Sequence, residues 1–159
     1  MKIKFSIICD GTAFERWQLR CLEQLQAAEG AQAVLVINVR DPAAGSIPLP
    51  DSLASLPAIT LTDGAARSVP KIRAHALDFI LSFAEERCPP ELLEAARYGV
   101  WAYRFGDWTR YRGAAAGFWE VYDAEPVTAA LLVRLQREAD EVVILREGYL
   151  HTEDRKSVV

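Results

Sequence analysis

Apolar residues occur in short, nearly continuous runs along the first two thirds of the chain, and turn-forming residues separate the runs. They cover residues 2–9, 33–39, 58–61, 77–83 and 98–103. Runs of this length, rich in β-branched side chains and without regular polar alternation, are typical of parallel strands covered on both faces. The pattern therefore predicts a series of strands in a buried sheet.

Segments with helical spacing lie between these runs. In residues 13–28 the large apolar side chains recur at helical intervals until a Glu-Gly pair ends the pattern, which predicts a helix. A second helix is predicted over 64–75, and a third over 89–97, where two prolines stand in the first turn, the position that tolerates them. Residues 40–57 contain four prolines and predict an irregular connection.

The last third of the chain predicts a short helix over 117–122 and strands over 127–135 and 142–150. Alternating strands and helices followed by two late strands predict an α/β fold. We expect a Rossmann-like, doubly wound, mostly parallel sheet with a late antiparallel strand. A chain of 159 residues fits one domain, which we place at 1–150, followed by a C-terminal tail at 151–159.

Charge and composition narrow the classes of function. The formal net charge is −4, so we do not expect a nucleic-acid-binding surface, which depends on clustered Lys and Arg. The apolar run Phe5–Cys9 is too short for a secretory signal, and no segment approaches the about 20 apolar residues of a membrane span. The three cysteines include no C-x-x-C pair, which predicts neither a disulfide framework nor a zinc site. We expect a cytoplasmic protein without a metal.

Residues 99–128 contain three of the four tryptophans and three of the five tyrosines. In doubly wound sheets, ligands bind beyond the carboxyl ends of the strands, an edge to which we assign residues 10–12, the segment after Phe83, and residues 104–113. Trp108 lies in a polar loop and is predicted to contact a ligand, whereas Trp119 is predicted to lie in the core. Gly11 and Thr12 either bind an anionic substrate group through backbone N–H groups or form a plain turn with Thr12 as N-cap.

Several motifs occur here in the same order as in a known family. They are Arg110-Tyr111-Arg112-Gly113, Phe118-Trp119, Glu125-Pro126-Val127-Thr128, and Asp140 ahead of Val143-Ile144-Leu145. This order resembles the folate-dependent formyltransferases, a superfamily that includes methionyl-tRNA, glycinamide ribonucleotide and sugar N-formyltransferases. In that family an Asn-x-His pair, a Tyr-Arg-Gly loop, a tryptophan-bearing helix, a Thr-Gly strand and an Asp-x-Gly precede a final apolar strand. The resemblance covers about 50 residues and implies the family's fold.

The resemblance also assigns catalytic positions. Counting back from Tyr111, the family asparagine falls on Ala102 and the family histidine on Arg104, while the aspartate is matched by Asp140. Ala102 offers no donor to an oxyanion, and losing one such donor typically costs about 100- to 1000-fold in rate. Arg104 stays protonated and cannot be a base, but it can stabilise an oxyanion or hold an anion. Asp140 is then the candidate proton acceptor, and a structural Arg104–Asp140 ion pair is the open alternative.

The formyl donor that the resemblance implies is 10-formyltetrahydrofolate. The cofactor-binding residues that it implies are Phe83, Ala84, Tyr111, Arg112 and Gly113. Gly11, Thr12 and Trp108 are the candidate substrate-binding residues.

Two functions follow from these assignments. The first is formyl transfer to the amino group of a small metabolite, such as an amino sugar or an amino acid. The alternative is a catalytically inactive domain of the same fold that serves as a small-anion binder or a partner subunit, which the replaced Asn and His favour. The expected partner is a small-molecule amine, and the sequence allows a homodimer.

Overall fold

The computed structural model describes residues 2–9, 14–39, 51–61, 64–84, 88–107, 110–111, 118–138 and 141–152, apart from the side chains of residues 51 and 52. The chain packs as two compact units, residues 1–101 and 102–159. The expected single domain over 1–150 and tail over 151–159 stay predictions.

The first unit contains four parallel strands. They are β1 (Ile3–Cys9), β2 (Ala31–Asn38), β3 (Ala58–Thr60) and β4 (Phe79–Ser82). Strand β1 pairs in parallel with both β2 and β4, and β2 pairs in parallel with β3. The chain therefore moves outward from β1 to β3 and then returns to the other side of β1. This reversal of strand order is the topological switch point of a doubly wound sheet.

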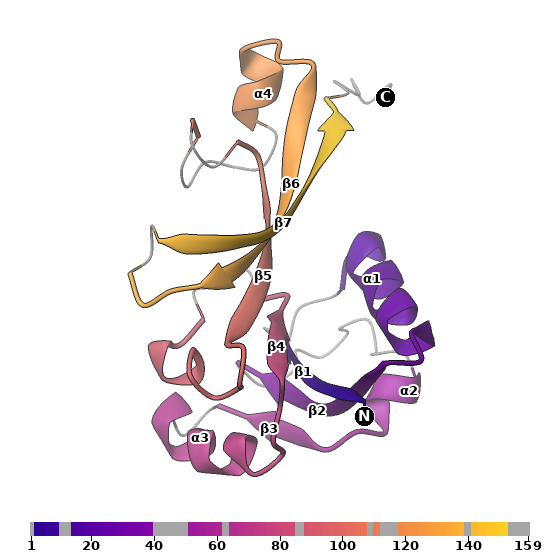
Figure 1. The fold of residues 1–159 in the computed structure, drawn as a ribbon, viewed down its shortest axis with the longest axis vertical. Coiled ribbons are helices and arrows are strands. Elements are labelled where there is room, and N and C mark those ends of the chain that lie inside the picture. Colours follow the sequence, from indigo (N-terminus) through magenta and orange to yellow (C-terminus); the bar gives the residue numbers. More distant parts are fainter. Residues whose placement is uncertain are drawn as a thin grey trace. The chain divides into compact units, whose positions relative to one another are not determined.

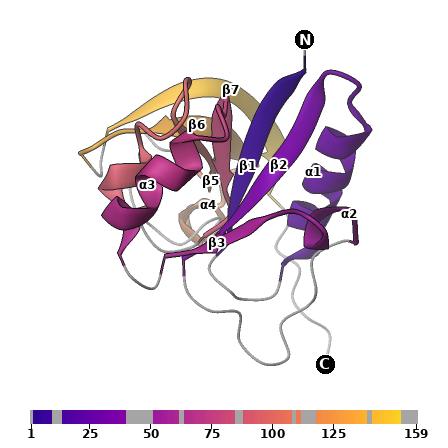
Figure 2. The ribbon, with the colours of Figure 1, turned by 90° about the horizontal axis from the view of Figure 1, so that it is seen from below.

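Two helices cover this sheet. They are α1 (Arg16–Ala27) and α3 (Ala65–Arg73), and they lie on opposite sides of the strands (Figure 2). Helix α1 begins with a capping box, in which the Glu15 side chain accepts from the backbone of the first turn and the Gln18 side chain accepts from the Glu15 backbone N–H. Such reciprocal bonds satisfy N–H groups that have no partner within the helix.

The apolar runs predicted as strands form the core of this unit. Phe5 through Cys9 are all buried in β1, as are all four residues of β4. The ring of Phe79 stacks between Phe5, at 5.3 Å between ring centroids, and Trp101, at 4.2 Å. Trp101, one of the aromatic residues in 99–128, thus packs within the unit, and its indole N–H donates to the Tyr98 carbonyl oxygen at 2.9 Å.

The second unit is built on an antiparallel hairpin. Its elements are the end of β5 (Val100–Phe105), α4 (Phe118–Tyr122), β6 (Val127–Leu135) and β7 (Val142–His151) (Figure 1). Strands β6 and β7 pair antiparallel from Val127 opposite His151 to Leu135 opposite Val142, with one register shift. The sheet order is β3-β2-β1-β4-β5-β6-β7. The predicted fold class, a mostly parallel α/β sheet with an antiparallel addition near the end, is confirmed.

One predicted element is wrong, and one connection contains a helix that was not predicted. Residues 89–97 form only a 3₁₀ turn, η1 (Pro90–Leu92), followed by further turns. The N–H groups of Leu92, Leu93 and Ala95 each donate to the carbonyl oxygen three residues earlier in the chain. This is the hydrogen-bond pattern of 3₁₀ turns, whereas an α-helix bonds four residues back. The predicted irregular connection over 40–57 contains a short helix, α2 (Asp51–Ala54), while residues 40–50 lie outside the described residues.

Helix α1 is the longest helix of the described ranges. Among the helices within those ranges, none combines the length and the apolar character that crossing a bilayer requires.

Candidate functional site

Strand β5 carries Ala102 and Arg104, two of the three positions that the family resemblance marks as catalytic. Its end is joined to β6 by the Gly106 N–H, which donates to the Ala129 carbonyl oxygen at 2.8 Å. Ala102 is 3% exposed and packs in an apolar cluster with Ala129, Leu131 and Val133. Because side chains two residues apart on a strand point to the same face, Arg104 lies on the face that Ala102 shares with this cluster.

Arg104 is half-buried at that face. Its guanidinium Nη1 donates to the carbonyl oxygen of Tyr103 at 3.0 Å. Burial lowers the pKa of Arg104 from its ordinary value, because removing a cation from water disfavours the charged form. The pKa of a free guanidinium lies so high that the side chain remains a cation at neutral pH. Arg104 therefore offers a positive charge and several donors next to an apolar floor.

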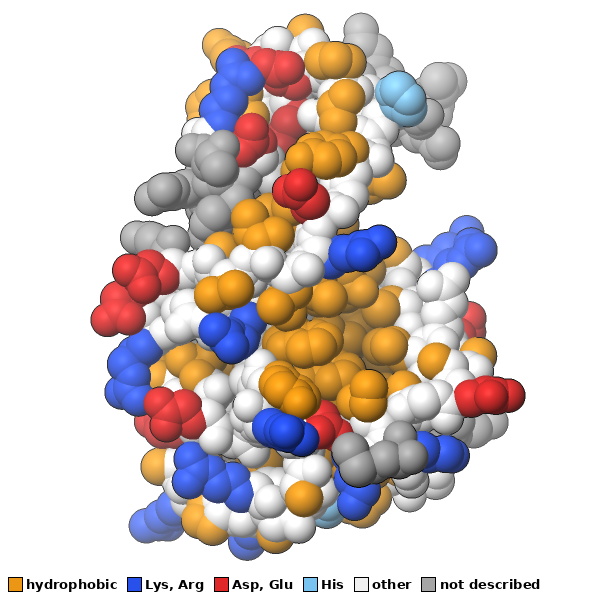
Figure 3. Space-filling view, in the orientation of Figure 1, with side chains coloured by type: hydrophobic (Ala, Val, Ile, Leu, Met, Phe, Trp, Pro, Cys, Tyr) orange, Lys and Arg blue, Asp and Glu red, His pale blue; other side chains and the backbone are white. Residues whose placement is uncertain are grey.

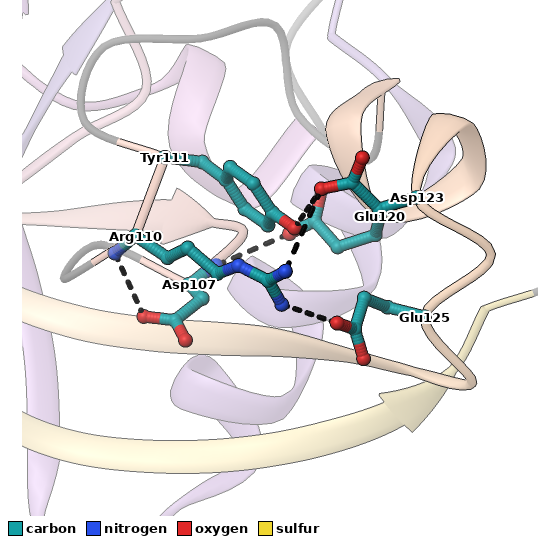
Figure 4. Close-up of polar contacts among 6 residues, drawn as sticks. All are labelled: Asp107, Arg110, Tyr111, Glu120, Asp123 and Glu125. Atoms are coloured by element: carbon teal, nitrogen blue, oxygen red, sulfur yellow. Dashed lines mark hydrogen bonds and ion pairs between the residues drawn. The ribbon is translucent and has the colours of Figure 1, made fainter.

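The backbone that follows β5 is held by a buried carboxylate. Glu120, on α4, is 2% exposed, and its Oε1 accepts from the Asp107 N–H at 3.1 Å (Figure 4). Gly106 has φ +101°, and a Cβ atom at this position would lie 2.9 Å from Glu120 Oε1. The close approach of the carboxylate and the positive φ both require glycine here. The hydrogen bond to Glu120 and the conformation of Gly106 together fix the backbone of residues 106 and 107, just after Arg104.

The Tyr111 loop is tied to the turn between α4 and β6. Arg110 pairs with Glu125 and Asp123, the latter at 3.7 Å, and the Tyr111 hydroxyl donates to Asp123 Oδ2 at 2.6 Å (Figure 4). The hydrogen bond to Asp123 raises the pKa of Tyr111 to about 12, because the carboxylate can accept a proton only from the neutral phenol. The pKa of Arg110 is also raised, and the largest cause is its hydrogen bond to Glu125. These contacts give Tyr111 a positional role.

Phe83 and Ala84, two of the residues implied for the folate, belong to the first unit. Phe83 follows β4, and its N–H donates to the Ile8 carbonyl oxygen at 2.9 Å, so it lies at the carboxyl ends of β1 and β4. Its ring is 8% exposed and makes edge contacts with Phe14 and Trp17. Phe83 thus packs within the first unit, and its role toward a folate stays a prediction.

Several predicted site residues lie outside the described residues. They are Gly11, Thr12, Trp108, Arg112, Gly113 and Asp140. Of the predicted catalytic residues, the described part of the chain includes Ala102 and Arg104, which it places on one face of β5. The Arg104–Asp140 pair and the role of Asp140 stay predictions.

The prediction that Trp119 lies in the core is wrong, since its side chain is 40% exposed. Helix α4 has its polarity reversed, because its buried residue is Glu120, while Phe118, Val121 and Tyr122 are exposed. Trp119 and Phe118 make an edge contact at 5.2 Å between ring centroids. The bond from Asp107 to the Glu120 carboxylate turns that side chain inward. Helix α4 has only five residues. Because Glu120 takes the face that points into the unit, the neighbouring Trp119 faces solvent.

A hollow of about 360 Å³ lies over the β6–β7 hairpin. The described residues that line it are Asp107, Val127, Ala129, Leu131, Ile144, Glu147 and Tyr149. In the upper part of Figure 3, apolar side chains gather over β6 and β7, with acidic side chains among them. Among the described residues, no three His, Cys, Asp or Glu side chains cluster in a way that could hold a metal ion.

The sequence analysis missed Glu120, Asp123 and Glu125 as residues that order the site. One signal pointed to Glu120, because it is the only charged residue in the apolar segment Phe118–Tyr122. No comparable signal marked Glu147 or Tyr149, whose position on the face of Ala129 and Leu131 depends on the pairing register of the hairpin.

No family model matches the sequence, and no curated protein matches it. The fold does match solved structures. A phosphoribosylglycinamide formyltransferase from Anaplasma phagocytophilum is 10% identical, with a TM-score of 0.75 over 99% of this chain and 76% of that chain. One from Bacillus halodurans is 13% identical, with a TM-score of 0.68 over 97% and 82% of the two chains.

A formyltetrahydrofolate deformylase from Pseudomonas syringae pv. tomato is 14% identical, with a TM-score of 0.72. That alignment covers 99% of this chain and 54% of the deformylase, so the present chain spans about half of it. Structural similarity at such low sequence identity shows a shared fold. The chain has the fold of the folate-dependent formyltransferases, as the resemblance implied.

Proposed function

We propose that this protein transfers a formyl group from 10-formyltetrahydrofolate to the amino group of a small metabolite. The observation that supports this most directly is the position of Arg104. It is half-buried on β5, in a chain with the fold of folate-dependent formyltransferases, where the resemblance places a catalytic side chain. Neighbours with this fold include proteins named as formyltransferases of phosphoribosylglycinamide and as deformylases of formyltetrahydrofolate.

The chemistry requires stabilisation of negative charge and removal of a proton. When the amine nitrogen attacks the formyl carbon, the carbonyl oxygen becomes an oxyanion, and a fixed cation at that point lowers the barrier. Arg104 supplies this charge in our proposal. The nitrogen must then lose a proton, and a carboxylate can accept it where arginine cannot. For the transfer to be complete, the oxyanion would collapse, the bond between the formyl carbon and N10 of the folate would break, and N10 would take up a proton as tetrahydrofolate leaves. We assign that role to Asp140.

Of the folate-binding residues implied by the resemblance, the described part of the second unit contains Tyr111, whose hydroxyl is already bonded to Asp123. Its ring can contact a flat ligand, while the hydroxyl holds the loop in place. Ala102 supplies no hydrogen-bond donor, so the donor set is smaller than in the family pattern. We therefore expect a slow enzyme whose rate depends on Arg104.

The proposal is tested by binding and turnover of the wild type and two variants. Calorimetry with 5-formyltetrahydrofolate measures binding, and transfer from 10-formyltetrahydrofolate to a panel of amino sugars and amino acids measures activity. Arg104→Ala should lower the rate about 100- to 1000-fold, and the exposed Arg97→His is the control that leaves it unchanged. If neither the wild type nor Ala102→Asn/Arg104→His binds the folate, the proposed function is wrong.

The burial of Ala102 favours a second function. Its methyl group fills an apolar cluster at the position of the family asparagine, as expected for a domain that retains the fold but binds only a small anion through Arg104. In that case the wild type shows no transfer, and Ala102→Asn/Arg104→His gains it. Transfer by the wild type that Arg104→Ala removes would reject the inactive domain.

A further inference from the structure

The two edge strands of the sheet differ in length. The strand order begins with β3 and ends with β7, and β3 has three residues whereas β7 has ten. Nine of the ten residues of β7 are exposed, and among the described strands only β6 lies beside it. Proteins usually keep an edge strand short or covered, because its unpaired backbone groups can bond to another strand. Strand β7 is therefore the edge that can accept a further strand.

Backbone hydrogen bonds show which groups of β7 point to the open edge. The Thr152 N–H, just after β7, donates to the Pro126 carbonyl oxygen at 3.0 Å, on the side of β6. Successive residues of a strand point their backbone groups to opposite edges. The partner strand agrees, since Ala129, which pairs with Tyr149, directs its carbonyl oxygen away from β7 and toward Gly106. The residues whose N–H and C=O groups face the open edge are Glu147, Tyr149 and His151.

The regular part of this edge is centred on Tyr149. The register shift in the hairpin makes Leu145 an extra residue in β7, and such a bulge bends a strand and interrupts its pairing. Regular strand geometry therefore runs over residues 146–152, to the Thr152 hydrogen bond. When such a segment overlaps fully with an antiparallel copy of itself, its central residue lies on a twofold axis. Tyr149 is that residue here.

The side chains of this segment are complementary to those of a second copy in that register. The two Tyr149 rings, each 65% exposed, lie opposite each other. Glu147 lies opposite His151 of the second copy, whose imidazole N–H can donate to the carboxylate. Arg146 lies opposite Thr152. Aromatic pairs and pairs of opposite polarity stabilise antiparallel strands, whereas directly opposed like charges destabilise them. An axis at Arg146 or at Glu147 would place like charges opposite each other.

We infer that β7 pairs with β7 of a second copy of this chain and joins the two β6–β7 hairpins into one antiparallel sheet. The three outward-facing residues of each copy then exchange backbone hydrogen bonds across the twofold axis. This pairing uses the open edge of both copies, so the assembly closes at two chains. The paired segment is much shorter than the about 20 to 30 residues that a standard interface contributes on each side. We therefore expect weak association, with a dissociation constant on the order of 100 µM.

The inference concerns assembly and is independent of formyl transfer. Sedimentation equilibrium of the full chain should show mainly monomer at about 10 µM and about 80% of the chains in dimers at about 1 mM. Over the same range, hydrogen exchange at the N–H groups of Glu147, Tyr149 and His151 should slow about fourfold. Exchange in β3, the other edge strand, should not change. A monomer at every concentration, growth beyond dimers, or equal slowing in β3 would overturn the inference.

A proline at the axis tests the backbone pairing. Tyr149→Pro removes an N–H that faces away from β6, a position at which an edge strand tolerates proline, and it should abolish the dimer up to about 1 mM. Tyr149→Thr keeps the N–H and loses only the ring, so it should weaken the dimer about threefold. Ile3→Thr, which removes a 50% exposed apolar side chain of the first unit, should change nothing. Circular dichroism verifies that each variant is folded.

An exchange of side chains tests the register, and it decides the question if Tyr149→Pro does not fold. His151→Glu places two carboxylates opposite each other in each of the two symmetric pairs and should weaken the dimer about fivefold. Glu147→His/His151→Glu forms the same pair in reverse and should restore the wild-type affinity. If this double variant stays as weak as His151→Glu, or if folded Tyr149→Pro dimerises as well as Tyr149→Thr, the inference is wrong.

Discussion

Strands β1 and β7 are both rich in apolar residues, but their surroundings differ completely. In β1 the five residues from Phe5 to Cys9 are buried, whereas β7 contains no buried residue over its ten positions. Strand β1 is paired in parallel on both sides, which places it at the centre of the first unit. Apolar composition therefore identifies a strand in both units, but burial depends on what covers the faces of the sheet, which in the first unit are helices α1 and α3 (Figure 2).

The same contrast holds for the helices. Helix α1 buries Leu22, whereas α4 buries the charged Glu120 and exposes Trp119. The first unit is thus organised by a conventional apolar core. In the second unit, the segments around β5 are ordered to a larger extent by polar contacts, and the apolar side chains of β7 form a surface.

The largest expected effect comes from equal truncations in the two strands. Ile7→Ala in β1, where the side chain is 0% exposed, should lower the free energy of unfolding by about 2 to 5 kcal/mol. Ile144→Ala in β7, where the side chain is 46% exposed, should lower it by about 1 kcal/mol or less. Urea unfolding followed by circular dichroism measures both. Equal losses would show that β7 is covered by a part of the protein as β1 is.

The next effect tests the reversed polarity of α4. Glu120→Ala removes the acceptor of the Asp107 N–H and should lower the free energy of unfolding by about 2 to 3 kcal/mol. Trp119→Gln, at an exposed position of the same helix, should change it by about 1 kcal/mol at most. A larger loss for Trp119→Gln than for Glu120→Ala in thermal unfolding would contradict the observed orientation of the helix.

Alanine substitutions at three glycines separate the energetic cost of backbone strain from the cost of a close contact. Gly106→Ala places a methyl group against Glu120 at φ +101° and should cost about 2 kcal/mol. Gly64 in the first unit has φ +96° but no atom within 4 Å, so Gly64→Ala should show the cost of strain alone, about 1 kcal/mol. Gly30→Ala, with neither constraint, is the control. If Gly106→Ala is as mild as Gly30→Ala in urea unfolding, the Glu120 contact is not formed.

The smallest effect is electrostatic and concerns Tyr111. Because Asp123 raises the pKa of Tyr111 to about 12, the bond stabilises the loop below about pH 10 and is lost as the pH rises through about 12. In Asp123→Asn the pKa of Tyr111 should fall toward its ordinary value. Absorbance titration of tyrosinate, with Tyr111→Phe to identify the transition, measures it. A Tyr111 transition that is the same in wild type and Asp123→Asn would contradict the bond.

Much of the fold could be predicted because the strands of the first unit depend on local pattern. The run from Phe5 to Cys9 has the composition of a doubly covered strand and is one, and the order of elements restricts a doubly wound sheet to few topologies. Residues 89–97 were predicted wrongly as a helix, because proline in a first turn favours both an α-helix and a 3₁₀ turn, and only packing selects between them.

The candidate site was predictable in part. Motif order singled out Ala102 and Arg104, but the predicted strand ended at residue 103, whereas the structure places both residues on β5. Residue types alone also could not show that Ala102 packs in an apolar cluster. Nor could they show that Glu120 reaches Asp107, thirteen residues away, since this contact depends on how α4 is placed against the end of β5.

By itself, the amino-acid sequence determined most of the elements, their α/β order and the formyltransferase-like motif order, because periodicity and turn residues act over a few neighbouring positions. Tertiary structure alone decided which apolar residues are buried, which carboxylate points inward and which side chains surround the hollow. These outcomes depend on strand register and on contacts between distant segments. A shift of one residue in β7 would move Glu147 and Tyr149 to the other face without any change in sequence.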